Sequence, residues 1–203
     1  MSRYTGPRVK IMRALGTDLP GLSPKKMEKR PYPPGQHGHA RKKLSEFALR
    51  LQEKQKLRKN YGITEKQLRG LVVEAGKGGG PTGHRLIELL ERRFDNVVFR
   101  AGFARTIPAA RQLVNHGHLL IDGKRVDIAS FRIRKGMKIS FRPRSQKLTT
   151  VETGFAIADT FQTPWLTVNR ETRECVVTNL PDETAILFPI TVQLVIEYYS
   201  QRL

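Results

Sequence analysis

Basic side chains that could bind a polyanion recur between Arg93 and Phe141. Guanidinium and ammonium groups carry a positive charge and several hydrogen-bond donors, which suits them to nucleic-acid phosphates. Short apolar runs separate these cations, among them Arg100, Arg105, Arg111, Lys124 and Arg125. The pattern predicts a small folded unit that offers a cationic surface to a nucleic acid.

A second basic stripe is expected on a helix that Ser45 caps. Arg50, Lys54 and Arg58 are four residues apart and therefore share one face of that helix. No acidic residue follows them at i+4, so we expect a basic face without compensating charge, although a merely solvated face also fits. The helix is predicted from an apolar stripe of Leu44, Phe47, Ala48 and Leu51.

Three further groups could carry chemistry, and each has a plainer explanation. His116 and His118 have no cysteine or carboxylate cluster beside them, which favours RNA-facing hydrogen bonds or structural packing over a metal site. The glycine-rich run 76–83 lacks the Gly-Lys-Ser/Thr ending of a phosphate loop and follows a predicted helix, which indicates a hinge. Cys175 lies among apolar residues and is expected to be a buried, reduced thiol.

Two short helices should position the first group of cations. Asp95 is expected to cap a helix that Gly102 ends, and Pro108 suits the first turn of a second helix that Gly117 ends. The apolar residues of the second helix should face inward, which turns its polar residues outward: Arg111, Gln112 and Asn115.

Strands are expected after these helices. Asp122-Gly123 is the favoured pair for a type I′ turn, which predicts a hairpin of residues 118–121 and 124–128. Further strands are predicted at 137–141, 165–168 and 175–178, before a closing apolar run at 190–199. Upstream, Thr64 to Gln67 forms a capping-box pattern that starts another helix.

The positive charge is confined to the first three quarters of the chain. Residues 1–60 hold 16 Lys and Arg against 4 Asp and Glu, and residues 61–147 hold 18 against 7. Residues 148–203 hold only 3 against 7, within a total net charge of +19. This charge predicts a polyanionic partner, and nucleic acid is favoured over a membrane surface because no long amphipathic helix is present. Without an apolar run of membrane-spanning length or a signal-peptide core, the chain is predicted to be cytosolic.

Residues Arg93-Phe-Asp95 to Ile128-Ala-Ser130 resemble the RNA-binding domain named after ribosomal protein S-four, most specifically in Ala109-Ala-Arg-Gln-Leu-Val-Asn-His-Gly-His118. Four other segments resemble the bacterial and organellar S-four family of the small ribosomal subunit: 34–38, 51–62, 164–168 and 195–200. The resemblance thus extends over essentially the whole chain. It departs from the family at Phe94, where leucine is usual, and in lacking the N-terminal cysteines that hold zinc in some members, so no metal or cofactor is predicted.

The resemblance implies an α+β fold. A helical N-terminal lobe with an extended basic N-terminal segment would carry an inserted helix-helix-β-hairpin domain of alpha-L type. The expected boundaries are 1–42 for the extended segment, 43–92 for the helical lobe and 93–147 for the inserted domain. Residues 148–203 are expected to form a C-terminal segment that packs on the N-terminal lobe and completes it.

The same resemblance implies a structural constituent of the small subunit, not an enzyme. It would bind 16S-type rRNA first, nucleate assembly of the 30S body, contact protein S-five, and influence translational accuracy near the mRNA entrance channel. The predicted rRNA-binding residues are Arg50, Lys54, Arg58, Arg93, Arg100, Arg105, Arg111, Gln112, Asn115, His116, His118 and Lys124. Arg41, Lys42 and Lys43 are expected to face mRNA at the channel, with an ordinary rRNA contact as the alternative.

An enzyme is the rival class, since pseudouridine synthases carry a similar module. Such an enzyme needs a catalytic domain of its own with a nucleophilic aspartate. About 56 residues follow the module here, too few for that domain, and Asp95 is better explained as a helix cap. The sequence therefore favours an RNA-binding structural protein.

Overall fold

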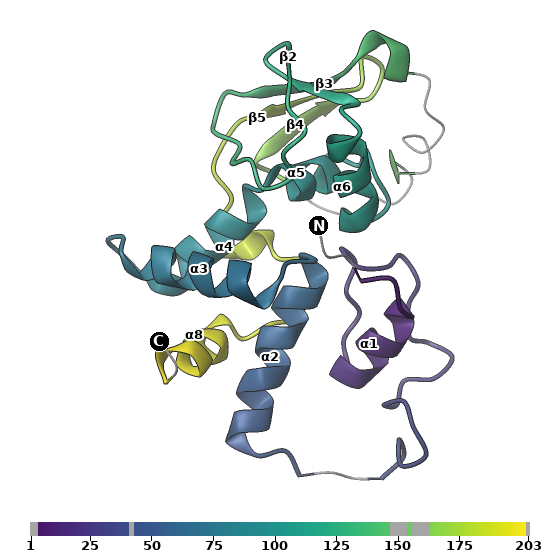
Figure 1. Ribbon diagram of the computed structural model, residues 1–203, viewed down its shortest axis with the longest axis vertical. Coiled ribbons are helices and arrows are strands. Elements are labelled where there is room, and N and C mark those ends of the chain that lie inside the picture. Colours follow the sequence, from purple (N-terminus) through teal and green to yellow (C-terminus); the bar gives the residue numbers. More distant parts are fainter. Residues whose placement is uncertain (1–3, 41–42, 147–153, 156–162, 202–203) are drawn as a thin grey trace. The chain divides into compact units, whose positions relative to one another are not determined.

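The computed structural model describes residues 4–40, 43–146, 154–155 and 163–201 (Figure 1). The chain forms two compact units. The helical unit consists of residues 1–86 and 186–203, and the sheet unit consists of residues 87–185. Helix α4, Thr82–Glu91, begins in the first unit and ends in the second.

The helical unit is built from α1 (Arg8–Leu15), α2 (Glu46–Asn60), α3 (Glu65–Gly76) and α8 (Val192–Ser200). As predicted, Ser45 caps α2, its side chain accepting a hydrogen bond from the Ala48 amide at 3.3 Å. The capping box of α3 is also confirmed, with both reciprocal hydrogen bonds between Thr64 and Gln67. Helix α8 packs against α2 and α3, as Figure 1 shows.

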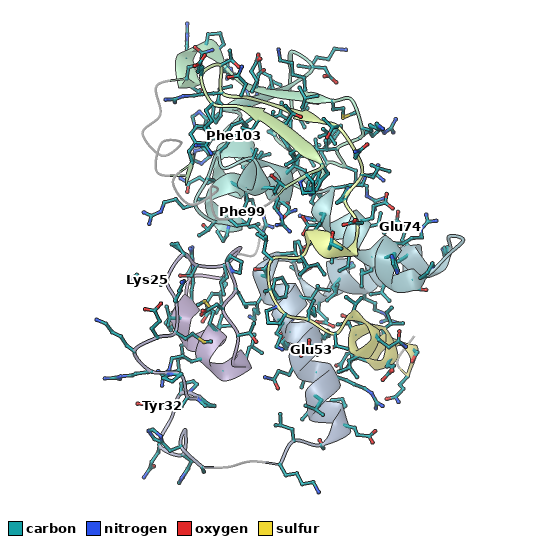
Figure 2. The ribbon with its side chains drawn as sticks, turned by 180° about the vertical axis from the view of Figure 1, so that it is seen from behind. Lys25, Tyr32, Glu53, Glu74, Phe99 and Phe103 are labelled. Atoms are coloured by element: carbon teal, nitrogen blue, oxygen red, sulfur yellow. The ribbon has the colours of Figure 1, made fainter. Side chains whose placement is uncertain are left out.

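The apolar stripe that predicted α2 is only partly buried. Leu44 and Phe47 are each 46% exposed, whereas Leu57 is fully buried. The helix was predicted correctly, but its buried residues are Lys54, Leu57 and Asn60, which lie beyond the predicted stripe. Helix α8 packs against α2, and its Tyr198 ring lies 5.9 Å from that of Phe47. Glu53 of α2, labelled in Figure 2, accepts a hydrogen bond at 3.0 Å from the amide of Thr191, the residue before α8.

The sheet unit begins with α5 (Phe94–Arg100) and α6 (Ile107–Asn115). Its described strands form a five-stranded antiparallel sheet in the order β2-β1-β3-β5-β4. Their bounds are β1 Leu119–Ile121, β2 Lys124–Arg125, β3 Lys138–Phe141, β4 Leu166–Asn169 and β5 Glu174–Val177. Helices α5 and α6 lie against one side of this sheet in Figure 1. Short 3-10 helices follow β3 and β5, at Pro143–Ser145 and Glu183–Ala185.

The predicted hairpin turn is confirmed. Asp122 and Gly123 both have positive φ, at 48° and 77°, as a type I′ turn requires. Strand β2 is shorter than the predicted range 124–128, because only Lys124 and Arg125 pair with β1. Five apolar residues of α4 and the start of α5 are all buried: Leu86, Ile87, Leu89, Leu90 and Phe94.

Aromatic side chains join the helices of the sheet unit to its strands. Phe99 and Phe103, labelled in Figure 2, are buried. The Phe103 ring meets that of Phe141 on β3 edge-on, with centroids 5.0 Å apart. Edge-to-face pairs at this distance add to the stability gained from burial.

The C-terminal segment is divided between the two units, which differs from the predicted boundaries. Strand β5 pairs with β3, placing Ile139 opposite Cys175, and β4 pairs with β5. Residues 163–185 thus belong to the sheet unit, and residues 186–203 alone join the helical unit. The physical reason is that β3 has a second edge, and pairing it with β5 buries Cys175 and Val177 almost completely.

Within the described residues, no helix is long and apolar enough to cross a membrane. Nor does that part of the chain contain a group of three or more His, Cys, Asp or Glu side chains that could hold a metal ion.

Candidate nucleic-acid interface

The candidate interface on the sheet unit starts at the joint between α5 and α6. The Thr106 hydroxyl caps α6 by accepting a hydrogen bond from the Ala109 amide at 3.3 Å, and Pro108 occupies the first turn, as predicted. Gly117 follows the C-cap with φ of 69°, and the amide of His118 bonds back to the Leu113 carbonyl at 3.1 Å. These ends fix where the polar face of α6 meets the hairpin.

A buried ion triad holds α5 to α6. The Asp95 side chain is fully buried and accepts hydrogen bonds from both Arg93, at 3.2 Å, and Arg111, at 2.9 Å from Nε. Asp95 was predicted to cap α5, and this is corrected: Arg93 is at the N-cap and Asp95 is the second helical residue. Its carboxylate faces two guanidinium groups, an arrangement that helix propensity alone does not reveal.

A second buried pair joins the end of α4 to α5. Arg100 donates to both oxygens of Glu91, at 2.9 Å and 2.7 Å, and Asn96 donates to the same carboxylate at 2.7 Å. Glu91 is fully buried and the Arg100 side chain is 3% exposed. Separating a buried ion pair leaves an uncompensated charge inside the protein, which is strongly destabilising. Arg100 therefore stabilises the fold.

The surface near the hairpin is cationic. The Arg125 guanidinium lies so close to Gly117 that a Cβ atom there would be 2.8 Å from its Cζ. Arg142 donates to the Gly117 carbonyl at 3.4 Å, and His118 Nδ1 lies 3.0 Å from the Ser145 hydroxyl. Burial lowers the pKa of His118, and the charges of His116 and Arg142 lower it further, so its imidazole is neutral at neutral pH.

The predicted residues of this unit separate into exposed and interior groups. Arg105, Gln112, His116 and Lys124 are exposed. Asn115, Arg111 and His118 are half-buried, and Arg93 and Arg100 are buried. The prediction from sequence placed the interior arginines among the cations that bind rRNA. Charge pattern alone does not show which arginine has a buried carboxylate beside it.

The basic stripe of α2 is compensated, contrary to the prediction. Arg50 pairs with Glu46 at 3.3 Å and with Glu197 of α8 at 3.1 Å. Glu46 lies four residues before Arg50, and Glu197 lies in a distant segment. The prediction considered only acidic residues at i+4 and therefore missed both.

Glu65 pairs with both remaining cations of the stripe. Lys54 pairs with it at 3.0 Å and Arg58 at 3.2 Å, and the Lys54 side chain is only 5% exposed. The expectation of an open basic face is therefore wrong for Lys54, whose ammonium lies 4.6 Å from the Tyr198 ring centroid.

Of the three residues predicted to face mRNA, Lys43 is exposed just before α2. Arg41 and Lys42 lie outside the described residues.

Sequence reasoning missed Arg142 as a candidate, and it placed Arg125 among the clustered cations without naming it as an rRNA contact. Both approach Gly117 from strands, Arg125 from β2 and Arg142 from just after β3. The signal that could have found them is the pairing of β1 with both β2 and β3, since it brings the ends of those strands to the α6 terminus.

The net charge is distributed unevenly between the units. Residues 1–86 and 186–203 hold 21 Lys and Arg against 7 Asp and Glu, a net of +14. Residues 87–185 hold 16 against 11, a net of +5. The arrangement therefore offers a modest, structured cationic surface on the sheet unit and a larger excess of positive charge on the helical unit.

Comparison with known proteins gives two family matches and several full-length relatives. Residues 3–91 match the ribosomal protein S4/S9 N-terminal domain, and residues 92–139 match the S4 domain. The small ribosomal subunit protein uS4 of Methylobacillus flagellatus is 55% identical over 205 residues, covering 100% of each chain. The protein uS4B of Nitrosomonas europaea is 51% identical over 205 residues, and uS4 of Synechocystis sp. is 51% identical over 203, again covering each chain in full.

Proposed function

The chain belongs to the family of the small ribosomal subunit protein uS4, and from that membership we propose that it binds folded rRNA through two separate cationic surfaces, one on each unit. The family is one of structural, rRNA-binding ribosomal proteins and not of enzymes. The structure divides the basic residues of this chain into those that stabilise the fold and those that face solvent.

The observation that carries the proposal is this division on the sheet unit. Arg93, Arg100 and Arg111 are held by the buried carboxylates of Glu91 and Asp95. Arg105 and Lys124 are exposed, and neither has an acidic partner among the described residues. The interior arginines thus shape the surface, and the exposed cations meet phosphate.

The mode of recognition follows from the ligand. Duplex RNA hides its base edges in a deep, narrow groove, so it is recognised through shape, phosphate and ribose hydroxyls. Arg105, Lys124 and Arg125 supply charge for phosphates. Gln112 and His116, both exposed, supply hydrogen bonds to ribose or to unpaired bases.

The second surface belongs to the helical unit, which has the larger net charge. We propose that its exposed lysines before α2 share the phosphate contacts, among them Lys25, Lys26 and Lys29. Arg50 and Arg58 are half-buried and paired, so they contribute less charge to RNA than an exposed lysine does.

The test is hydroxyl-radical footprinting of the whole chain on protein-free small-subunit rRNA, together with affinity at several salt concentrations. Protection confined to one multi-helix junction and a steep loss of affinity with salt are expected. Binding to RNA without other proteins would also support a role in nucleating the 30S body. A flat salt dependence, or protection scattered along the RNA, would contradict the proposal.

The charges can be assigned by two matched triple variants. Arg105, Lys124 and Arg125 are changed to Gln in one, and Lys25, Lys26 and Lys29 in the other. Each removes three positive charges, so each should reduce the salt slope of binding, by up to about 0.7–0.9 for each phosphate that is no longer neutralised. The footprint should shrink at different sites in the two variants. If one triple variant leaves slope and footprint unchanged, that surface does not contact RNA.

A contact with mRNA is proposed at residues 41–43, which precede the N-cap of α2. Lys43 is exposed there, and three adjacent cations suit a sliding contact with phosphate. Charge reversal at the three positions should impair the unwinding of structured mRNA by assembled subunits and change translational accuracy, without loss of rRNA affinity. Equal loss of both activities would instead indicate an ordinary rRNA contact.

A protein neighbour is proposed at the start of α2. Leu44 and Phe47 are three residues apart and each is 46% exposed, so together they present apolar surface beside the basic segment that precedes α2. The family resemblance makes protein S-five the candidate. Substitution of both residues by Ser should weaken binding of S-five to the assembling subunit and leave binding of the chain to rRNA intact. Unchanged S-five binding would exclude this surface.

The chain is a component of the small ribosomal subunit, and we propose the cytosolic ribosome as its location. The bacterial origin of its relatives supports this location over an organellar one. Fractionation of cells by sucrose gradient, followed by detection of the chain in small subunits, would test it.

A further inference from the structure

We propose that Arg13 is a positioning residue, which folds the basic segment of residues 25–40 against α1 before any RNA is bound. The inference rests on the proposed RNA-binding function for its consequence, but the fold of the segment can be tested without RNA. Arg13 lies in the last turn of α1, where a positive charge is also favoured by the helix dipole.

The contacts of Arg13 are directed at backbone rather than at an acid. Its Nε donates to the carbonyl oxygens of Arg30, at 3.1 Å, and Tyr32, at 3.0 Å. Its Cζ lies 5.0 Å from the centroid of the Tyr32 ring, within the range of a cation–π contact. One side chain therefore fixes the main chain at two points and a ring at a third.

The segment beyond Tyr32 closes on itself. The rings of Tyr32 and His39 lie with centroids 3.9 Å apart. The Gly38 amide bonds to the Gly35 carbonyl at 3.3 Å, and a Cβ atom at Gly38 would collide with the Pro33 carbonyl and approach the Tyr32 ring. Tyr32 is thus the point at which this loop joins the Arg13 guanidinium.

The start of the segment is anchored separately. The Met27 amide donates to Asp18 at 3.1 Å, and the Gly21 amide donates to Asn60 of α2 at 2.9 Å. Between this anchor and the loop, Arg13 is the side chain that ties residues 30–32 to a helix. The lysines and arginine carried by this stretch are exposed: Lys25, Lys26, Lys29 and Arg30.

The consequence is preorganisation. Prolines and glycines without helix or strand would otherwise leave these cations on a mobile chain, and ordering that chain at the moment of binding would reduce affinity. Arg13 moves part of this ordering into the folding of the free protein. Its own contribution to RNA binding is therefore indirect, through the cations that it positions.

The test compares Arg13→Gln and Arg13→Lys with the control Lys29→Gln in the full-length chain. Arg13→Gln and Lys29→Gln remove one charge each, whereas Arg13→Lys keeps the charge but loses the forked, planar donor group. Hydrogen exchange of the free protein is followed at the amides of Arg30 and Gly38, with amides of α2 and α3 as the measure of global folding. rRNA affinity and footprint are measured on the same variants.

Both Arg13 variants should exchange faster than the parent at Arg30 and Gly38, with α2 and α3 unchanged, and Lys29→Gln should not. Arg13→Gln should also lose about threefold more rRNA affinity than Lys29→Gln, because it loses order as well as charge. Parent-like exchange in Arg13→Gln, or equal affinity loss in the two charge-matched variants, would overturn the proposal. Failure of the parent to bind rRNA would reject the proposed function and leave the exchange result to decide the role of Arg13.

Discussion

Asp95 and Arg111 meet across the α5–α6 joint, with Arg111 Nε 2.9 Å from Asp95 Oδ2 and the carboxylate fully buried. Arg93 donates to the same carboxylate from the N-terminal end of α5. One acid thus holds two guanidinium groups, and these three side chains keep a net positive charge at the joint to α6, the helix whose surface carries the exposed Gln112. This arrangement makes Asp95 a determinant of that surface rather than a helix cap.

Replacement of Asp95 by Asn should strongly destabilise the protein. The change keeps the shape but leaves two buried or half-buried guanidinium groups without their counter-charge, which costs about 3–5 kcal/mol in comparable sites. Urea unfolding at neutral pH measures the loss. Asp127→Asn is the control, since its pair with Arg125 spans 3.8 Å between side chains that are each 55% exposed, and should cost about 1 kcal/mol or less. Equal losses in the two variants would show that the triad does not hold the joint.

Arg100 and Arg105 allow structural and RNA-binding cations to be told apart. Arg100→Gln should lower the free energy of unfolding by several kcal/mol, because the buried Glu91 carboxylate loses the positive charge and both hydrogen bonds of Arg100. Arg105→Gln should leave stability almost unchanged and instead weaken rRNA binding, with a salt slope smaller by about 0.7–0.9 if it contacts one phosphate. Urea unfolding and filter binding of both variants test this division. A stable Arg100→Gln protein with weakened binding would assign Arg100 to RNA after all.

Much of the fold was predictable because its signals are local. The Thr64 capping box, the left-handed Gly117 and the Asp122-Gly123 turn depend on neighbouring residues, and all three were confirmed. The predictions that failed depend on distant partners. Strand β5 is recruited by β3 across more than thirty residues, and no sequence spacing encodes that pairing.

Dependence on distant partners also explains why the roles of single residues in the candidate site were not predicted. Sequence pattern identified the basic region, but it could not separate Arg100, which pairs with Glu91, from Arg105, which is exposed. On α2, Lys54 was predicted to face solvent, yet Glu65 and Tyr198 enclose it. Charge along a chain predicts the class of ligand, whereas the contact residues depend on which acids the fold brings close.

Substitution of Gly117 by Ala should weaken rRNA binding by more than its loss of stability explains. Gly117 and Gly123 both have positive φ, so Ala at either position should cost about 1–2 kcal/mol. At Gly123 a Cβ meets nothing within 4 Å, whereas at Gly117 it meets the Arg125 guanidinium, which has to move aside. Gly117→Ala should therefore lose more rRNA affinity than Gly123→Ala at similar stability. Adding Arg125→Ala to both should remove the difference in affinity, and a difference that persists would exclude Arg125 as its cause.

Glu65 should make the docking of α8 depend on pH. Burial alone raises the pKa of Glu65, but hydrogen bonds from Tyr199, at 2.7 Å, and from Lys54 and Arg58 outweigh it and hold the pKa below its ordinary value. The stabilisation is therefore complete above the ordinary carboxyl pKa, near pH 4, and is lost as the pH falls through the lowered value. Because the side chain is 43% exposed, Glu65→Gln should cost only about 1 kcal/mol at pH 7. The difference in the free energy of unfolding between Glu65→Gln and the parent should shrink below pH 4, as measured by urea unfolding across pH. A difference that persists undiminished at the lowest pH would mean that the carboxylate charge is not its source.

The thiol of Cys175 should report opening of the sheet. Burial raises its pKa to about 12, so almost no thiolate is present at pH 8, and its strand lies between β3 and β4. Since the chain has a single cysteine, any reaction with a thiol-specific disulfide reagent comes from this residue. The folded protein should react very slowly and the urea-unfolded protein at once, with a normal thiol pKa.

In sub-denaturing urea, Asp95→Asn should react faster than the parent, because it lowers the free energy needed to open the sheet unit. Asp127→Asn, which loses little stability, should react at a rate much closer to that of the parent. Rapid reaction of the folded parent would show that β5 leaves the sheet without global unfolding.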